Sequence, residues 1–125
     1  YKQFRCSIVA VEEVPMDEVH KYGIISGEMI RDDIFQVNDM VEKPSTEDAP
    51  SNLAIIGRYI LTPDIFDILR ETVAGVGGEI QITDALMKQA KEGCVLAYKF
   101  KGKRFDCGSI EGFIDATNYC YKTYY

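Results

Sequence analysis

The feature that most constrains the fold is one nearly continuous apolar run at residues 53–61, LAIIGRYIL. A half-exposed strand alternates apolar and polar side chains, whereas a run of this kind is typical of a strand covered on both faces. Thr62-Pro63-Asp64 follows directly and is a helix-start signal, with a hydroxyl at the N-cap and proline at the first helical position. The strand and the helix together indicate an α/β arrangement.

The rest of the chain alternates strand and helix patterns. Apolar and β-branched runs predict strands at residues 4–14, 22–26, 35–42 and 94–100, with Gly27-Glu28 as a turn. Helical spacing predicts helices at about residues 62–71, 83–92 and 110–123, the last with Phe113, Ala116, Thr117 and Cys120 on one stripe. Residues 44–52 are rich in turn formers and predict an exposed loop. We expect one domain, residues 1–125, built on a mixed sheet.

Charge and cysteine content exclude several classes of protein. Fourteen Lys and Arg against twenty Asp and Glu give a net charge of −6, which argues against nucleic acid or an anionic membrane as a partner. No stretch approaches the roughly 20 apolar residues of a membrane helix, and we expect a cytoplasmic protein. The cysteines form no C-x-x-C pair, so we expect reduced, mostly buried thiols rather than a zinc site. They are Cys6, Cys94, Cys107 and Cys120.

Glu42 and Lys43 are the first candidate site residues. They end a predicted strand immediately before the long loop, where ligands of open α/β sheets tend to bind. A carboxylate there can accept sugar hydroxyls, and an ammonium can meet a phosphate. From the residues alone, two solvated charges at a strand end are the commoner interpretation.

Asp106 is the second candidate, in a strand-to-helix connection that ends at Gly108 and Ser109. Mg²⁺ prefers a few carboxylate oxygens together with phosphates and water, so Asp106 could bind a divalent cation. A carboxylate that satisfies backbone N–H groups in a turn is the alternative. His20 is the only histidine and has no nucleophilic Ser or Cys near it in the sequence, so a hydrolase triad is not supported.

Several segments, taken in order, carry a resemblance to a known family. They are Tyr22-Gly23-Ile24-Ile25, Met40 to Pro44, Ala49 to Tyr59, Gly77 to Leu86, and Phe105-Asp106-Cys107-Gly108. Their order and spacing cover nearly the whole chain. Together they resemble the bacterial UTP–glucose-1-phosphate uridylyltransferases, a group of sugar nucleotidyltransferases.

The resemblance implies a fold and a reaction. The family fold is a mixed-sheet, three-layer α/β nucleotide-diphosphosugar transferase, and this chain looks like its carboxyl-terminal half. The family converts UTP and glucose 1-phosphate to UDP-glucose and pyrophosphate with Mg²⁺, and its members commonly form homo-oligomers.

The resemblance also implies a role for each matching residue. Gly23 would let backbone approach the sugar, and Glu42 would accept glucose hydroxyls. Lys43 would act in catalysis by neutralising the sugar phosphate. The backbone near Ile55 would line the sugar pocket, and Asp106 would sit by the Mg²⁺ site.

One departure from the family pattern limits what the chain can do alone. The family's glycine-rich nucleotide loop and its other metal-binding Asp have no counterpart in these 125 residues, so we expect the isolated chain to be inactive. The alternatives are a stand-alone sugar-phosphate-binding or assembly module without catalysis, or part of a sister enzyme that uses another nucleotide. A reading frame that starts near Tyr1 would favour the module, and a longer upstream frame would favour a fragment.

Overall fold

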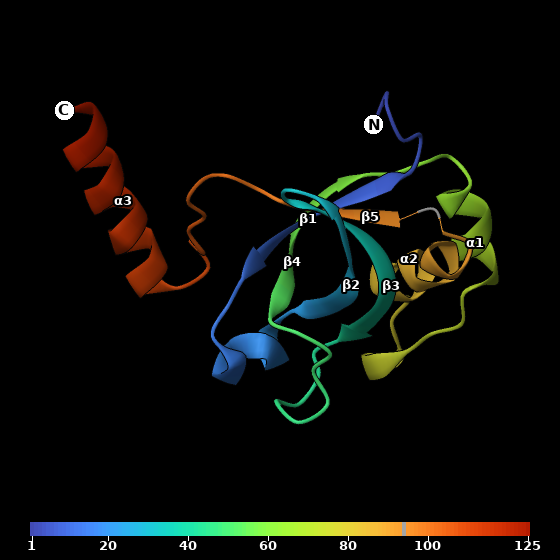
Figure 1. The fold of residues 1–125 in the computed structure, drawn as a ribbon. Helices are drawn as coiled ribbons and strands as arrows, with labels where there is room; N and C mark the ends of the chain where they lie inside the picture. Colours follow the sequence, from blue (N-terminus) through green and yellow to red (C-terminus); the bar gives the residue numbers. More distant parts are fainter. Residues whose placement is uncertain (94) are drawn as a thin grey trace.

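The computed structural model describes residues 1–93 and 95–125, which form a small barrel with helices at opposite sides of it (Figure 1). The strands are β1 (Ser7–Glu13), β2 (Gly23–Arg31), β3 (Ile34–Glu42), β4 (Leu53–Ile60) and β5 (Val95–Lys99). The helices are α1 (Ile65–Glu71), α2 (Ile82–Lys91) and α3 (Ile110–Tyr124), with short 3₁₀ segments η1 (Met16–Lys21) and η2 (Val76–Gly78). No helix of the described residues is long and apolar enough to cross a membrane.

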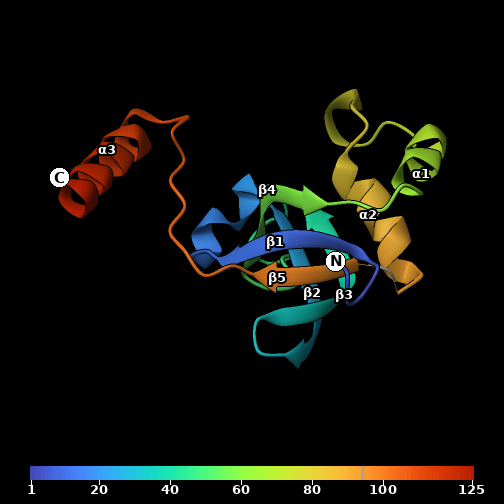
Figure 2. The same cartoon turned by 90° about the horizontal axis from the view of Figure 1, so that it is seen from above.

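The strands close into a barrel in the order β1-β4-β2-β3-β5. β1 pairs with β5 in parallel, and the other neighbours pair antiparallel. The sheet is therefore mixed, as predicted. Closure pairs both long sides of β1, and it brings the end of β5 beside β1, where the segment leading to α3 begins (Figure 2).

β2 is longer than the sequence predicts. Gly27-Glu28 is not a turn but part of the strand, which continues to Arg31 through a register shift between Ser26 and Gly27. A Cβ at Gly27 would lie 2.1 Å from the carbonyl oxygen of Gln36, so the glycine is needed for close approach of β3 rather than for a turn. The sequence signal was genuine, but it marked a bulge.

The main core lies between the barrel and α2. Val9, Val11, Ile25 and Val37 point inward from the strands. From α2, Ala85, Leu86 and Ala90 pack on them. Two of these three helical side chains are methyl groups, so the helix lies close to the sheet. A smaller cluster under η1 holds Val14, Val19, Ile24 and Ala54.

The apolar run at residues 53–61 does form a strand, β4, but it is covered on both faces only at its start. Ala54 and Ile55 are buried, whereas Gly57, Arg58 and Ile60 are exposed. The prediction of a strand buried throughout was therefore wrong for its second half. The helix after it begins at Ile65, and the hydroxyl of Thr62 meets Ser7 and Gln89 instead of capping the helix.

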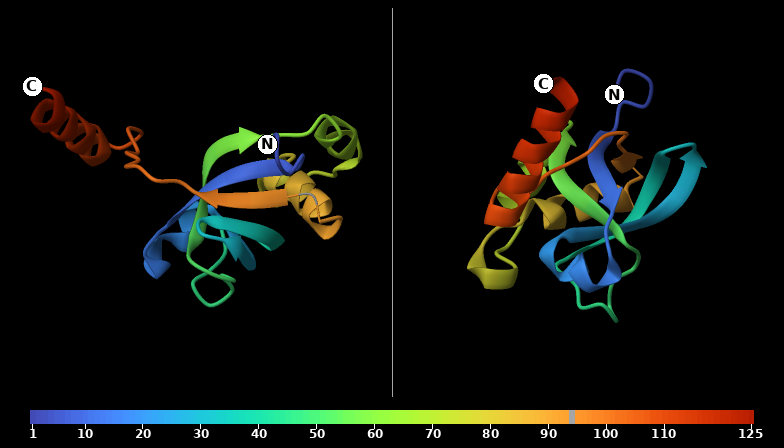
Figure 3. Two further views of the ribbon diagram at one scale, coloured as in Figure 1. Left: turned by 45° about the horizontal axis from the view of Figure 1, so that its top comes forward. Right: turned by 90° about the vertical axis from the view of Figure 1, so that its left-hand side faces the viewer.

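α3 stands apart from the barrel, at the end of an extended segment (Figures 1 and 3). Every residue of this helix is at least partly exposed, including Phe113 at 61% and Tyr121 at 70%. The predicted stripe exists but faces solvent, together with Cys107 and Tyr125. Cys107 and Cys120 are free thiols as predicted, but both are exposed rather than buried. Cys94 lies outside the described residues.

We predict that α3 is much less stable than the barrel. A helix of about 15 residues is marginal in water when little tertiary packing supports it, and α3 has no buried residue. In hydrogen exchange, α3 amides should exchange at least about 100-fold faster than the central amides of β1. The measurement should be repeated after tenfold dilution, because self-association would protect the helix. Equal protection of α3 and β1 at both concentrations would contradict the prediction.

Candidate functional site

Gly23, Glu42 and Ile55 line one cavity of about 260 Å³. The sequence predicted these three as site residues, and the structure brings them together. This volume is slightly below the roughly 300 Å³ at which pockets for drug-sized ligands begin, so the cavity suits a smaller molecule such as a sugar. The remaining lining residues are Lys21, Tyr22, Gly57, Tyr59, Gln81, Ile82 and Thr83.

Three strands and one helix start build the cavity. Gly23 and Glu42 are directly paired across β2 and β3, and Ile55 comes from β4. A Cβ at Gly23 would lie 3.1 Å from Glu42 Oε2 and 3.4 Å from Thr83 Oγ1. The φ angle of Gly23 is not in the left-handed region, so its missing side chain matters for space. That space is taken by Glu42 and by Thr83 of α2.

The Glu42 carboxylate is held by a hydrogen bond. Thr83 Oγ1 donates to Glu42 Oε2 at 2.7 Å, and Thr83 is only 6% exposed. An ionised carboxylate is an acceptor with about four lone-pair positions, so acceptor capacity remains after this bond. The cavity therefore presents a fixed carboxylate that can accept hydrogen bonds from hydroxyl groups.

Tyr59 supplies a hydroxyl to the same cavity. Burial of the half-buried ring raises the pKa of the Tyr59 phenol, and the negative charge of Glu42 raises it further. Because the shift is upward from a value already near 10, the phenol keeps its proton at physiological pH. Tyr59 can therefore donate a hydrogen bond to a ligand.

Lys43 does not line the cavity with the other predicted residues. Its side chain is exposed, and its backbone N–H donates to the carbonyl of Tyr22 at 2.9 Å. Its φ is +47°, a left-handed conformation that a non-glycine residue adopts at a cost of about 1–2 kcal/mol. Such strain clusters at functional sites. The cation in the cavity wall is Lys21, whose pKa is raised by its hydrogen bond to Glu18.

Asp106 lies in a second cavity, of about 570 Å³. The structure does not place it with Gly23, Glu42 and Ile55. Asp106 Oδ1 accepts the N–H of Gly108 at 3.0 Å, which is the turn role that the sequence left open. Arg58, Lys103 and Arg104 line the same cavity and give it positive charge.

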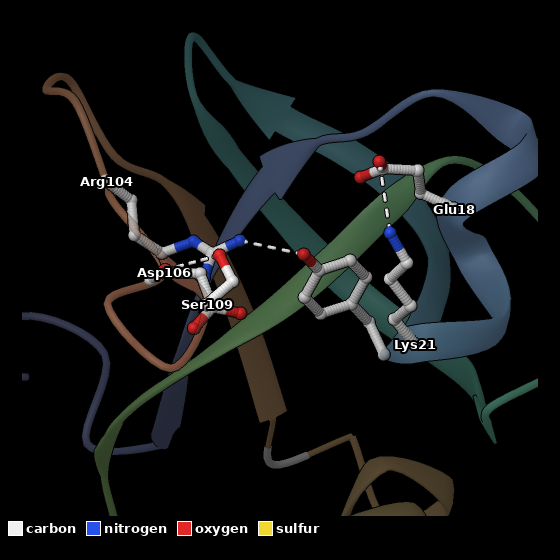
Figure 4. A network of polar contacts seen from close by, with 6 residues as sticks. Glu18, Lys21, Arg104, Asp106 and Ser109 are labelled. Carbon is white, nitrogen blue, oxygen red and sulfur yellow. Dashed lines mark hydrogen bonds and ion pairs between the residues drawn. The ribbon is translucent and has the colours of Figure 1, made fainter. Parts of the chain in front are cut away.

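Arg104 lines the second cavity and bonds a residue of the first, and Figure 4 shows its side chain next to Asp106. Its Nε donates to Glu12 Oε1 at 2.5 Å, and its Nη2 donates to the Tyr22 hydroxyl at 3.0 Å. Tyr22 lines the first cavity, whereas Arg104 lines the second and stands two residues before Asp106. This side chain therefore fastens the segment carrying Asp106 to β1 and to the wall of the sugar-sized cavity.

Asp106 fits Mg²⁺ only as one ligand among several. Within residues 1–93 and 95–125, no group of three His, Cys, Asp or Glu side chains could hold a metal ion. Mg²⁺ commonly takes one or two carboxylates and completes its shell with phosphate oxygens and water. A single carboxylate in a cavity open to phosphates is compatible with that chemistry.

Sequence reasoning missed several lining residues. Gln81 and Thr83 belong to a segment whose polar side chains and helix start were visible, but nothing in the pattern aimed them at Glu42. Tyr59 was hidden in the apolar run. Only the packing of α2 beside β3 and β4 reveals them.

Comparison with known families decides where the chain belongs. The family model described as nucleotidyl transferase matches residues 2–123. The chain belongs to the nucleotidyl transferase family. The match covers nearly all of the 125 residues.

Individual relatives of this nucleotidyl transferase chain agree with the family. The UTP–glucose-1-phosphate uridylyltransferase of Pseudomonas aeruginosa strain PAO1 is 76% identical over the whole chain. The enzyme of the same name from Bacillus subtilis strain 168 is 49% identical over 94% of it. A crystal structure of UDP-glucose pyrophosphorylase complexed with UDP-glucose matches 98% of the chain at 62% identity and a TM-score of 0.93. The predicted nucleotidyltransferase fold class is confirmed.

The nucleotidyl transferase chain spans less than half of these proteins. It covers 45% of the Pseudomonas relative, 40% of the Bacillus relative and 46% of the crystallised chain. The family resemblance seen in the sequence is thereby supported for a part of a longer enzyme. That this part is the carboxyl-terminal half stays a prediction.

We predict that replacing Arg104 loosens the segment that carries Asp106. Arg104→Gln removes the pair with Glu12 and the bond to Tyr22, and it should lower the free energy of unfolding by about 1–2 kcal/mol. Urea denaturation measures this change. Arg70→Gln is the matched control, because the Arg70–Asp67 pair is exposed on α1 and should contribute little. Equal effects of the two substitutions would contradict the role given to Arg104.

Proposed function

We propose that the chain holds glucose 1-phosphate within a uridylyltransferase that converts UTP and this sugar phosphate to UDP-glucose and pyrophosphate. The observation that carries the proposal is the cavity in which Gly23 leaves room for a Glu42 carboxylate held by Thr83. The names of the relatives supply the reaction, and the cavity supplies a place for the sugar.

The cavity's chemistry suits a sugar. Glu42 can accept hydrogen bonds from two neighbouring hydroxyls, and the protonated Tyr59 hydroxyl and the Gln81 amide supply donors in the same cavity. Gly23 and Ile55 also line the cavity, and the missing side chain of Gly23 leaves the space in which the Glu42 carboxylate and the Thr83 hydroxyl lie. Lys43, which is exposed and adjacent to Glu42 in the chain, would neutralise the phosphate, and Lys21 in the cavity wall adds a second positive charge.

The proposed reaction needs positioning and charge neutralisation rather than a protein nucleophile. A phosphate oxygen of glucose 1-phosphate attacks the α-phosphorus of UTP in line. The new oxygen–phosphorus bond forms as the bond from the α-phosphorus to the bridging oxygen breaks, and pyrophosphate leaves with that oxygen. When the sugar phosphate is held in an attacking position, the entropic contribution to the activation free energy of the reaction is smaller.

Mg²⁺, when bound, supplies positive charge against the phosphate oxygens. Asp106 would contribute one carboxylate ligand, and Arg104 would keep that carboxylate beside the sugar cavity. The remainder of the longer enzyme would then supply the nucleotide pocket. A sister enzyme with another nucleotide would keep the same sugar cavity, since the base would be held outside this chain.

Two further parts of the proposal concern the setting of the enzyme. We place it in the cytoplasm, where exposed thiols such as those of Cys107 and Cys120 are expected to stay reduced. We also propose that the enzyme is a homo-oligomer. The exposed aromatic side chains of α3 support a contact with further protein, either another copy or the rest of the polypeptide.

We predict that the isolated chain binds glucose 1-phosphate but makes no UDP-glucose from it. Calorimetry should show binding at least about tenfold tighter than that of inorganic phosphate, because the sugar adds hydrogen bonds in the cavity. Glu42→Gln should remove most of this preference, whereas Glu28→Gln, an exposed change on β2, should keep it. Equal affinity of the wild-type chain for the two ligands would overturn the proposed function. UDP-glucose formation by the chain alone would overturn the proposal that the remainder of the longer enzyme supplies the nucleotide pocket.

A further inference from the structure

Thr83 is a buried polar side chain with a specific partner across the cavity. It belongs to the first turn of α2, which begins after Gln81, and its hydroxyl donates to Glu42 Oε2 at 2.7 Å. A threonine hydroxyl in a helix commonly turns back to bond the backbone of its own helix. Here it leaves its own element and reaches the last residue of β3. The bond therefore joins two elements at the floor of the cavity.

The surroundings of this bond leave little freedom. Ala85 and Leu86, the residues that follow in α2, are fully buried against the barrel, so the start of the helix is held in place. On the other side, Gly23 approaches Glu42 Oε2 and Thr83 Oγ1 so closely that even one methyl group would be 3.1 to 3.4 Å from them. One oxygen of the carboxylate is thus bound on a rigid base, while the group as a whole faces the cavity.

We propose that Thr83 is a positioning residue that fixes the Glu42 carboxylate in the orientation that accepts sugar hydroxyls. This inference rests on the proposed function. A glutamate side chain can adopt several rotamers, so a carboxylate without a partner changes position and must be ordered when the ligand binds. Thr83 carries out that ordering before the sugar phosphate arrives. Its effect is specific to the sugar, because the phosphate is held by other side chains.

The matched substitutions are Thr83→Val and Thr83→Ser. Valine has nearly the shape of threonine but lacks the hydroxyl, whereas serine keeps the donor. Thr83→Val should weaken binding of glucose 1-phosphate to the chain about tenfold, the size of one hydrogen bond to a charged group. Thr83→Ser should stay within about threefold of the wild type. Binding of inorganic phosphate should be equal in all three proteins, which a general loss of structure would not allow.

A second measurement tests the positioning without a ligand. Side-chain NMR couplings of Glu42 should report one rotamer in the wild type and in Thr83→Ser, and averaging over several in Thr83→Val. If Thr83→Val binds the sugar phosphate as tightly as the wild type, or if the couplings do not change, the inference is wrong. If the couplings change as expected but the wild type does not prefer the sugar phosphate over phosphate, the proposed function fails while the orienting effect of Thr83 on Glu42 stands.

Discussion

The packing of α2 against β3 is the contact on which the proposed site depends. Ala85, Leu86 and Ala90 bury one face of the helix on the barrel, and this sets the helix start beside the end of β3. Thr83 then meets Glu42, and Gln81 reaches the same cavity. Without this packing, Glu42 would be a charge at a strand end with no fixed orientation. The burial of apolar side chains further along α2 therefore positions the polar residues at its start, which form the site.

Barrel closure has a parallel effect on the second cavity. Pairing of β5 with β1 brings the residues just after β5 to β1, where Phe100 N–H donates to the carbonyl of Val11 and Arg104 bonds Glu12 and the hydroxyl of Tyr22. Tyr22 precedes Gly23, so one side chain links the segment of Asp106 to the sugar-sized cavity. In the proposed enzyme, this linkage sets the distance between the bound sugar phosphate and the Mg²⁺ ligand Asp106. α3 is largely exposed and contacts this segment through Tyr119, whose ring centroid lies 5.3 Å from that of Phe105.

The sequence predicted most elements because their signals are local. Apolar runs and helix stripes identified the strands and helices to within a few residues, and the fold class was right. Failures came where tertiary contacts decide. Gly27 marked a bulge where β2 pairs with β3 rather than a turn. The second half of β4 is exposed instead of buried, and the apolar stripe of α3 faces solvent.

The candidate site shows the same division. Local pattern alone favoured two solvated charges for Glu42 and Lys43 and a turn carboxylate for Asp106, and the turn contact of Asp106 is present. The ordered resemblance to a family selected Gly23, Glu42 and Ile55, which the fold brings into one cavity. Tyr59 and Thr83 carried no sequence signal for this role, because the contact of Thr83 with Glu42 spans 41 positions.

The most direct test of the central claim is to map glucose 1-phosphate on the chain by amide chemical shifts. If the cavity of Gly23, Glu42 and Thr83 holds the sugar phosphate, the largest saturable changes will occur at those amides and at Lys43. Changes confined to Arg58, Lys103 and their neighbours around the second cavity would contradict the account, as would the absence of saturable changes.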